Sequence, residues 1–413
     1  MVFIRILCKP GLGQGFRIWQ SGQETESLHY LREALYPRVQ DMHLIEREIL
    51  TCVAELDPNP VQQHKLRHAM SHLADPARLI TTAVKEGLAG LLYKNLKNAG
   101  ALQSLEAQHK ERLESLYYAT VRFNLRLIHD LKQVLNLLNE KKLPVVLLQG
   151  IALLPQIYND IGLRPLTDID LWVLPKDYHG LIGVLSGLGY ERDPLYLNTF
   201  RKGSTIIDIN THILGADRIR TRALLLAIDQ EHVYRDGRAV NFEGYQGLCL
   251  NKYDQVLLLS VHALKHSVSR LIWLVDIKSL IAGWKTSDWK ALMHRAKELG
   301  QEKTLSYVLF LLAQVFDFCL PIEFGQLPGT ERISFFEKKV LGRRIGGDCL
   351  PLWGPFLLLP AGKPLHKRIA FFTENLFPRP EILRQVFPHF SSRPVWQLYV
   401  KRVLQLAGMI KMS

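Results

Sequence analysis

The segment LRPLTDIDL, residues 163–171, is the most informative stretch of this chain. It leads into an alternating apolar run, IDLWVL at 169–174, which predicts a β-strand. Asp168 and Asp170 are two residues apart, so both side chains project from one face of that strand. Neighbouring carboxylates repel each other unless a cation lies between them, and their oxygens suit Mg²⁺. The segment therefore predicts a metal site at the start of the strand.

Two further features support that interpretation, because a D-x-D pattern alone also occurs at solvated strand ends. Asp208 lies within another predicted strand, TIIDIN at 205–210, where a buried charge is costly unless it is paired or binds a metal. Upstream, a buried strand at 144–148 ends in the turn Gln149-Gly150 and leads into a helix. Together these features predict a site formed by three carboxylates.

Apolar periodicity divides the rest of the chain into a small α/β core and two helical regions, one of which contains a long helix at about 105–141. We expect a flexible leader at 1–27, a helical region at 28–140, the core at 141–246, a second helical region at 247–320 and a basic, proline-rich region at 321–413. In the last region, regular structure is expected only in a final amphipathic stretch from about 395 to 410.

The composition is that of a globular protein, with 47% hydrophobic and 22% charged residues among 413. The net charge is +13, and 14 Lys/Arg against 6 Asp/Glu place about +8 of it after residue 320. A basic region of this kind can contact an anionic membrane, a nucleic acid or a polyphosphate, or it can form a solvated face.

The five cysteines are scattered, and no pair has C-x-x-C or zinc-ligand spacing. No apolar run reaches the roughly 18–20 residues that a membrane span requires, and the start does not match a signal peptide. We therefore expect a reduced, cytoplasmic protein.

A histidine pair and a lysine lie together on a predicted helix in the second helical region. His262 and His266 are four residues apart and share one helical face, with Lys265 beside them. Paired histidines suggest a metal, but the sequence offers no third ligand. Two alternatives stay open: Lys265 or His266 lines a nucleotide cleft, or the face is half-buried in ordinary packing.

These motifs resemble the uncharacterised nucleotidyltransferase family of bacterial proteins, a branch of the polymerase β-like nucleotidyltransferase superfamily. The resemblance spans about residues 48–320. The matching segments are Arg122-Phe123-Asn124, the turn Leu148-Gln149-Gly150, the D-x-D segment 163–171, Asp208, the H-x-x-K-H motif 262–266, and the W-x-x-D motif Trp273 to Asp276.

The resemblance implies an α+β protein with a polymerase β-like core. It implies transfer of a nucleoside monophosphate from a nucleoside triphosphate such as ATP to a hydroxyl group, with release of pyrophosphate. Asp168, Asp170 and Asp208 would be the catalytic and metal-binding residues, for Mg²⁺ or Mn²⁺. The nucleotide would be contacted by Gln149, Gly150, Arg164, Thr167, Lys265 and His266. For Arg164, a role in fixing the turn before the strand is an equal alternative.

The acceptor is expected to be a small molecule, a glycan precursor or a protein, because the chain lacks the repeated aromatic platforms of a single-strand binder.

Two residues depart from the family pattern: Gln149 replaces a lysine in the glycine turn, and Asn210 stands where relatives often have histidine. Glutamine offers phosphate only a neutral donor. A non-catalytic nucleotide-binding regulatory protein and an antitoxin-like or scaffold protein that binds partners therefore remain alternatives.

Overall fold

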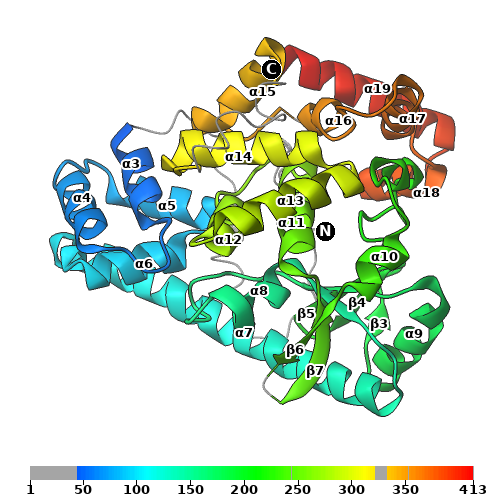
Figure 1. Ribbon diagram of the computed structural model, residues 1–413, viewed down its shortest axis with the longest axis horizontal. Helices are drawn as coiled ribbons and strands as arrows, with labels where there is room; N and C mark the ends of the chain where they lie inside the picture. Colours follow the sequence, from blue (N-terminus) through cyan, green and yellow to red (C-terminus); the bar gives the residue numbers. More distant parts are fainter. Residues whose placement is uncertain (1–43, 243, 321–332, 352, 413) are drawn as a thin grey trace.

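The computed structural model describes residues 44–242, 244–320, 333–351 and 353–412, and Figure 1 shows the arrangement of its elements. The expected leader at 1–27 and the first part of the helical N-terminal region lie outside the described residues. The expected α+β class is confirmed: helical regions flank a single mixed sheet. None of the described helices is long and apolar enough to cross a membrane.

The N-terminal region is helical throughout its described part. Its elements are α3 (Leu44–Val53), α4 (Pro60–Ser71), α5 (Pro76–Glu86), α6 (Ala89–Asn98), the 3-10 helix η1 (Ala101–Ser104) and α7 (Ala107–Glu140). A capping box begins α4: the Gln62 N–H donates to Asn59 Oδ1 at 3.0 Å, and the Asn59 N–H donates to Gln62 Oε1 at 2.8 Å. The 34-residue helix α7 confirms the predicted long helix and runs from this region to the sheet (Figure 1).

Seven strands form the sheet, in the order β3-β4-β5-β2-β1-β7-β6. They are β1 (Val146–Leu148), β2 (Ile169–Trp172), β3 (Glu191–Arg192), β4 (Thr199–Lys202), β5 (Thr205–Asn210), β6 (Arg238–Phe242) and β7 (Tyr245–Cys249). The strands β1, β2 and β5 confirm the three predicted ones and occupy the middle of the sheet. The other four flank them, two on each side, with β3 and β6 at the edges, and their polar side chains obscure the apolar alternation.

Helices cover this sheet and connect its strands. They are α8 (Gln149–Ile157), α9 (Tyr178–Gly187), α10 (Gln230–Arg235) and the 3-10 helices η2 (Pro175–Asp177) and η3 (Arg220–Leu225). The helix α7 contacts β5 and β7, while α8 contacts β1 and β2. Parallel pairing of β2 with β5, and antiparallel pairing of β2 with β1, brings the predicted site segments to neighbouring positions.

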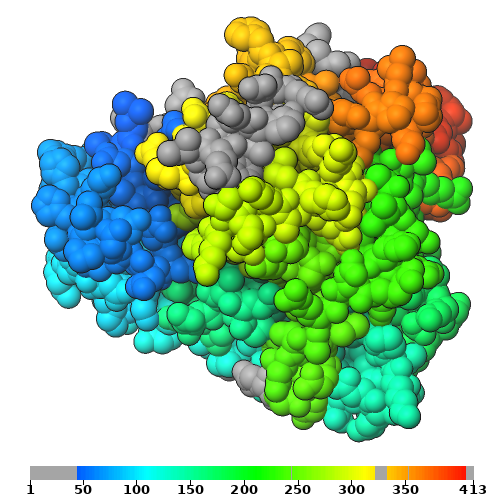
Figure 2. All heavy atoms as spheres, viewed as in Figure 1, coloured from blue at the N-terminus to red at the C-terminus, as the bar shows by residue number. Residues whose placement is uncertain are grey.

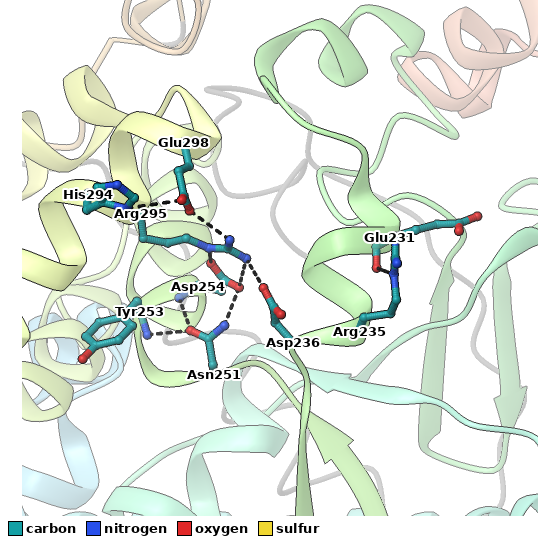
Figure 3. Close-up of polar contacts among 9 residues, drawn as sticks. All are labelled: Glu231, Arg235, Asp236, Asn251, Tyr253, Asp254, His294, Arg295 and Glu298. Carbon is teal, nitrogen blue, oxygen red and sulfur yellow. Dashed lines mark hydrogen bonds and ion pairs between the residues drawn. The ribbon is translucent and has the colours of Figure 1, made fainter.

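The second helical region consists of α11 (Lys252–Lys265), α12 (Ile272–Ile281), α13 (Thr286–Leu299) and α14 (Glu302–Phe316). An ion-pair network joins two of these helices (Figure 3). Arg295 of α13 donates to both carboxylate oxygens of Asp254 in α11, at 2.6 and 2.8 Å, and to Asp236 at 2.8 Å. Asn251 begins α11 by accepting from the Tyr253 and Asp254 N–H groups.

The C-terminal region is more regular than its prolines suggested. It contains α15 (Phe335–Ile345), α16 (Gly354–Leu358), α17 (Leu365–Leu376), α18 (Pro380–Val386), the 3-10 helix η5 (Pro388–Phe390) and α19 (Val395–Met412). The expectation of lost regularity up to residue 395 is therefore wrong. Prolines stand at the first turns of α16 and α18, where no N–H is needed, so they start helices instead of breaking them.

One continuous hydrophobic core includes side chains from both helical regions and the sheet. Figure 2 shows the surface of α12–α14, in yellow-green to yellow, between the blue N-terminal helices and the orange C-terminal ones. A smaller cluster of Leu383, Phe387 and Leu398 holds α18 against α19. The helical regions therefore pack directly on the sheet.

Candidate active site

The two strands that carry the predicted carboxylates pair side by side. Asp170 of β2 lies directly opposite Asp208 of β5 in the parallel register, and Asp168 immediately precedes β2. Asp208 is 6% exposed, whereas Asp168 and Asp170 are partly buried. Residues 38 and 40 positions apart in the chain thus meet at one place, as the D-x-D segment and the TIIDIN strand predicted.

The electrostatics of Asp170 show how closely these groups act on one another. Burial, followed by the negative charges of Asp168 and Asp208, raises the pKa of Asp170 well above its usual range. Hydroxyl groups hold the other two carboxylates: Thr167 Oγ1 donates to Asp168 at 2.9 Å, and Thr199 Oγ1 to Asp208 at 2.5 Å. With these rotamers, no group of three or more His, Cys, Asp or Glu side chains in the described ranges is arranged to hold a metal ion.

The turn after β1 is tightly constrained. Gln149 adopts a left-handed backbone conformation with φ of 56°, which costs a residue with a Cβ about 1 kcal/mol or more. At Gly150, a Cβ would lie 2.6 Å from Leu166 Cδ2 and 3.3 Å from Arg164 Nη2. The glycine therefore allows the start of α8 to pack against the LRP segment, and Gln149 is held strained at the end of β1.

Arg164 lies beneath this turn in a buried ion pair. Its Nε and Nη2 donate to Asp276 of α12, with Nη2 to Oδ2 at 2.8 Å, and its Nη1 donates to the Pro165 carbonyl at 2.7 Å. Tyr158 Oη also donates to Asp276, at 2.6 Å. The structure thus favours the interpretation in which Arg164 fixes the turn before the strand, and the WxxD motif supplies its partner.

Asn124 of α7 fastens the same segment from the other side. Its Nδ2 donates to the carbonyls of Ile161 and Arg164 at 2.6 and 2.8 Å, and its Oδ1 accepts from the Leu166 N–H at 3.3 Å. The polar groups of a buried loop must be satisfied in this way. The Arg122-Phe123-Asn124 motif therefore acts through Asn124, as a support for the D-x-D segment.

Lys265, at the end of α11, faces the carboxylates. Burial and the nearby Arg222 lower its pKa to about 7, while Asp170 and Asp208 act in the opposite direction. Arg218 also acts on Lys265 and on Asp208. Three cationic side chains thus gather beside the acidic cluster, of which the sequence analysis identified only Lys265. The signal that it passed over is the alternate arginines at 218, 220 and 222, in the loop after the strand of Asp208.

The C-terminal region holds this arginine loop in place. Glu374 of α17 accepts hydrogen bonds from the N–H groups of Arg220 and Thr221, at 2.9 and 2.7 Å, and from Thr221 Oγ1 at 2.6 Å. Arg379 donates to the Asp217 carbonyl at 2.9 Å. Part of the basic region is therefore a support for the site, although this does not test the predicted contact with an anionic surface.

The predicted histidine pair packs against tryptophan. The rings of His262 and His266 lie 4.7 Å apart, and Trp273 lies 5.0 and 5.7 Å from them. Burial and the charge of Lys265 lower the pKa of His262 well below its usual range, so its imidazole is neutral. His266 follows the last residue of α11 and does not line the cavity described next.

A cavity lies beside Lys265, between the end of β1, the loop after β5 and α11. Part of it is open to solvent. Its lining residues are Leu147, Leu148, Gln149, Ile213, Leu214, Leu250, Gln255, Leu258, Leu259, Val261, His262 and Lys265. Gln149 and Lys265, both predicted to contact nucleotide, are thus brought together, whereas Arg164 and Thr167 are not part of this wall. Gly150 adjoins it at the start of α8.

Comparison with known proteins agrees with this geometry. No curated protein and no solved structure matches the chain. A family model described as "uncharacterised nucleotidyltransferase" matches residues 72–317, which include the sheet, the three aspartates and α11. The chain therefore belongs to this family of nucleotidyltransferases.

Proposed function

We propose that this protein transfers a nucleoside monophosphate from a nucleoside triphosphate to a hydroxyl group of a non-polymeric acceptor and releases pyrophosphate. Membership of a nucleotidyltransferase family supports nucleotidyl transfer in general. The observation that carries the specific proposal is the pairing of Asp170 with Asp208 on adjacent strands, with Asp168 beside them and cationic side chains opposite.

The proposal includes a divalent cation, Mg²⁺ or Mn²⁺, held by Asp168, Asp170 and Asp208. The donor set fits such an ion, because it consists of carboxylate oxygens, and burial together with the charges of Asp168 and Asp208 raises the pKa of Asp170. Binding of the ion would require the Asp168 and Asp208 side chains to rotate away from the Thr167 and Thr199 hydroxyls. When bound, the ion would neutralise phosphate charge and polarise the reacting phosphoryl group.

The chain's own groups would bind and orient the triphosphate. The N–H groups of the first turn of α8, at Gln149 and Gly150, have no partners within the helix and suit phosphate oxygens. Lys265 and Arg218 would supply positive charge near Asp208, with Arg222 close to both cations. Asp208, the most buried of the three aspartates, would accept the proton of the attacking hydroxyl.

The acceptor class is a proposal from the sequence: a small molecule, a glycan precursor or a protein. The second candidate, a regulatory protein that binds nucleotide without turnover, is favoured by one observation, the neutral Gln149 at the predicted phosphate turn. The two differ in one measurable way, because only the first releases pyrophosphate.

The test is release of pyrophosphate or transfer of label from each of the four α-labelled nucleoside triphosphates, with Mg²⁺ or Mn²⁺ and a cell extract as the source of acceptor. We expect activity from the wild type and a loss of at least 100-fold in Asp168→Asn and Asp208→Asn, the scale of one group in a catalytic set. Asp193→Asn is the matched control, since Asp193 pairs with Arg201 outside the site.

Unchanged activity in Asp168→Asn or Asp208→Asn would refute the assignment of the active site. Nucleotide binding by the wild type, without turnover under any of these conditions, would favour the regulatory candidate.

A further inference from the structure

One face of α11 supplies much of the wall of the cavity. Gln255, Leu258, Leu259, His262 and Lys265 recur at helical spacing, so they form a single stripe along the helix. At a rise of 1.5 Å per residue, Gln255 lies about 15 Å along the axis from Lys265. This distance is comparable to the length of an extended nucleoside triphosphate.

The two ends of the stripe differ in chemistry. At one end, the amine of Lys265 feels the charges of Asp170 and Asp208, where the phosphates of the proposed substrate would lie. Away from Lys265, the wall is mostly apolar, with side chains from α11, from the end of β1 and from the segment that leads into α11. The apolar members are Leu147, Leu148, Ile213, Leu214, Leu250, Leu258, Leu259 and Val261.

Two polar atoms in this wall have no partner. Gln255 is 4% exposed, and within the described residues nothing donates a hydrogen bond to its Oε1. His262 Nδ1, another polar atom of the wall, likewise has no hydrogen-bond partner within the described residues. Buried polar atoms are almost always bonded, so an orphaned amide oxygen on a cavity wall points to a ligand that brings the donor.

The backbone of Gln255 is held in place. Its N–H donates to the Asn251 carbonyl at 2.9 Å. The preceding residue, Asp254, is fully buried and is fixed by Arg295 and Asn251, as Figure 3 shows. The unpaired oxygen therefore does not result from a frayed helix end. The amide projects from a fixed point of the helix, so its reach into the cavity is set by the side chain alone.

We infer that the cavity binds the nucleobase of the donor nucleotide and that Gln255 selects adenine, an inference that rests on the proposed function. The leucine and isoleucine side chains accept a planar ring. A glutamine amide pairs with adenine through two hydrogen bonds, accepting from the N6 amino group and donating to N7. Guanine and uracil would present a carbonyl to Gln255 Oε1, and cytosine carries a donor on a smaller ring that fills less of the cavity.

The experiment is calorimetric binding of ATP, GTP, CTP and UTP, together with AMP and inorganic tripolyphosphate. We expect the wild type to bind ATP at least about 10-fold more tightly than GTP or UTP, the discrimination of one good amide–base pair. Gln255→Leu and the nearly isosteric Gln255→Glu should remove most of this preference and leave binding of tripolyphosphate unchanged. Ser260→Ala, a buried change on α11 away from the cavity, should keep the preference.

Equal affinity of the wild type for the four triphosphates, or an intact preference in both Gln255 variants, would overturn the inference. If Gln255→Leu lowers the melting temperature more than the Ser260→Ala control does, the base preference is judged from Gln255→Glu alone.

Failure of the proposed function would look different. No nucleotide would then give pyrophosphate release that depends on Asp208, while AMP binding that depends on Gln255 would persist. Turnover with no dependence on the base would instead reject the selection by Gln255 alone.

Discussion

Arg164 and Asp276, which are 112 residues apart in the chain, form a buried ion pair that joins the D-x-D segment to α12. Their side chains are 6% and 0% exposed, and Tyr158 donates a further hydrogen bond to Asp276. The motif residues before β2 and the WxxD motif in α12 are therefore two halves of one contact. It holds the turn from which Asp168 and Asp170 project.

Breaking this pair should be costly, because removal of one partner leaves the other charge buried. We expect Asp276→Asn to lower the free energy of unfolding by about 3–5 kcal/mol, measured by urea denaturation. Arg343→Ala, which breaks the exposed pair with Asp348, should change it by less than about 1 kcal/mol. Equal effects of the two substitutions would contradict the structural role of Asp276.

The acidic cluster should make stability depend on divalent cations. Melting temperatures of the wild type are expected to rise with Mg²⁺ or Mn²⁺, by the equivalent of about 2.7 kcal/mol at 100 times the dissociation constant. Asp170→Asn should abolish that response and be no less stable than wild type without metal, since it removes one of three like charges. A metal response that persists in Asp170→Asn, or is lost in the control Asp193→Asn, would oppose the proposed ligand set.

The raised pKa of Asp170 also sets the sign of a pH effect. Between the unfolded value of about 3.9 and the higher folded value, the folded state holds a proton that the unfolded state has lost. The free energy of unfolding of the metal-free wild type should therefore fall as the pH rises through this window. The slope should be smaller in Asp170→Asn, as urea titrations at a series of pH values would measure.

Lys265 should take up a proton when a triphosphate binds. Burial and Arg222 lower its pKa to about 7, so at pH 8 most of the free protein carries a neutral amine. Nearby phosphate favours the charged form, and we expect uptake of up to one proton, measured by calorimetry in buffers of different ionisation enthalpy. Lys265→Met should abolish it. Lys363→Met is the control, because burial also lowers the pKa of Lys363, to about 8. Lys363 donates to the Gly300 carbonyl, away from the site, so this variant should keep the proton uptake.

Replacement of Gln149 by lysine tests the departure from the family pattern. Because Gln149 lines the cavity at the predicted phosphate turn, Gln149→Lys should bind nucleoside triphosphate about 10-fold more tightly, the effect of one charge-assisted contact. Stability should change little, since both residues accept the same left-handed backbone conformation at equal cost. Gln156→Lys adds the same charge at an exposed position of α8 and should leave affinity unchanged. An equal gain in both variants would show only a general charge effect.

The C-terminal region should influence nucleotide binding through Glu374. Glu374→Ala removes the acceptor of three hydrogen bonds from the arginine loop, so Arg218 and Arg222 lose their fixed position. We expect calorimetry to show several-fold weaker binding of nucleoside triphosphate. Binding of AMP should be less affected, because AMP carries a single phosphate and so depends less on the arginine loop. Glu381→Ala, at an exposed position of α18, is the control. Unaltered triphosphate binding in Glu374→Ala would remove the arginine loop from the proposed phosphate site.

Much of the fold was predictable because its signals are local. The apolar alternation around Asp170 and the TIIDIN run around Asp208 correspond to β2 and β5, and helical periodicity located α7 and α11 to α14. The outer strands β3, β4, β6 and β7 were not predicted, because strands with many polar or exposed residues depend on their pairing partners for stability. The final amphipathic stretch was predicted and corresponds to α19, but α15 to α18 were not, since prolines were interpreted as breaks although they stand in the first turns of α16 and α18.

The sequence by itself determined the three aspartates, the glycine turn and the three central strands β1, β2 and β5, because each depends on the spacing of residues that are close in the chain. Only the tertiary structure decided that Arg164 pairs with Asp276 rather than lining the cavity, that Arg218 and Arg222 join Lys265 opposite the carboxylates, and that α17 holds their loop. It also placed Gln255, whose amide oxygen has no partner among the residues that the structure describes, in the wall of the cavity beside Lys265. These relationships join segments 40 to 160 residues apart, and packing decides them, because residue spacing carries no record of which surfaces meet.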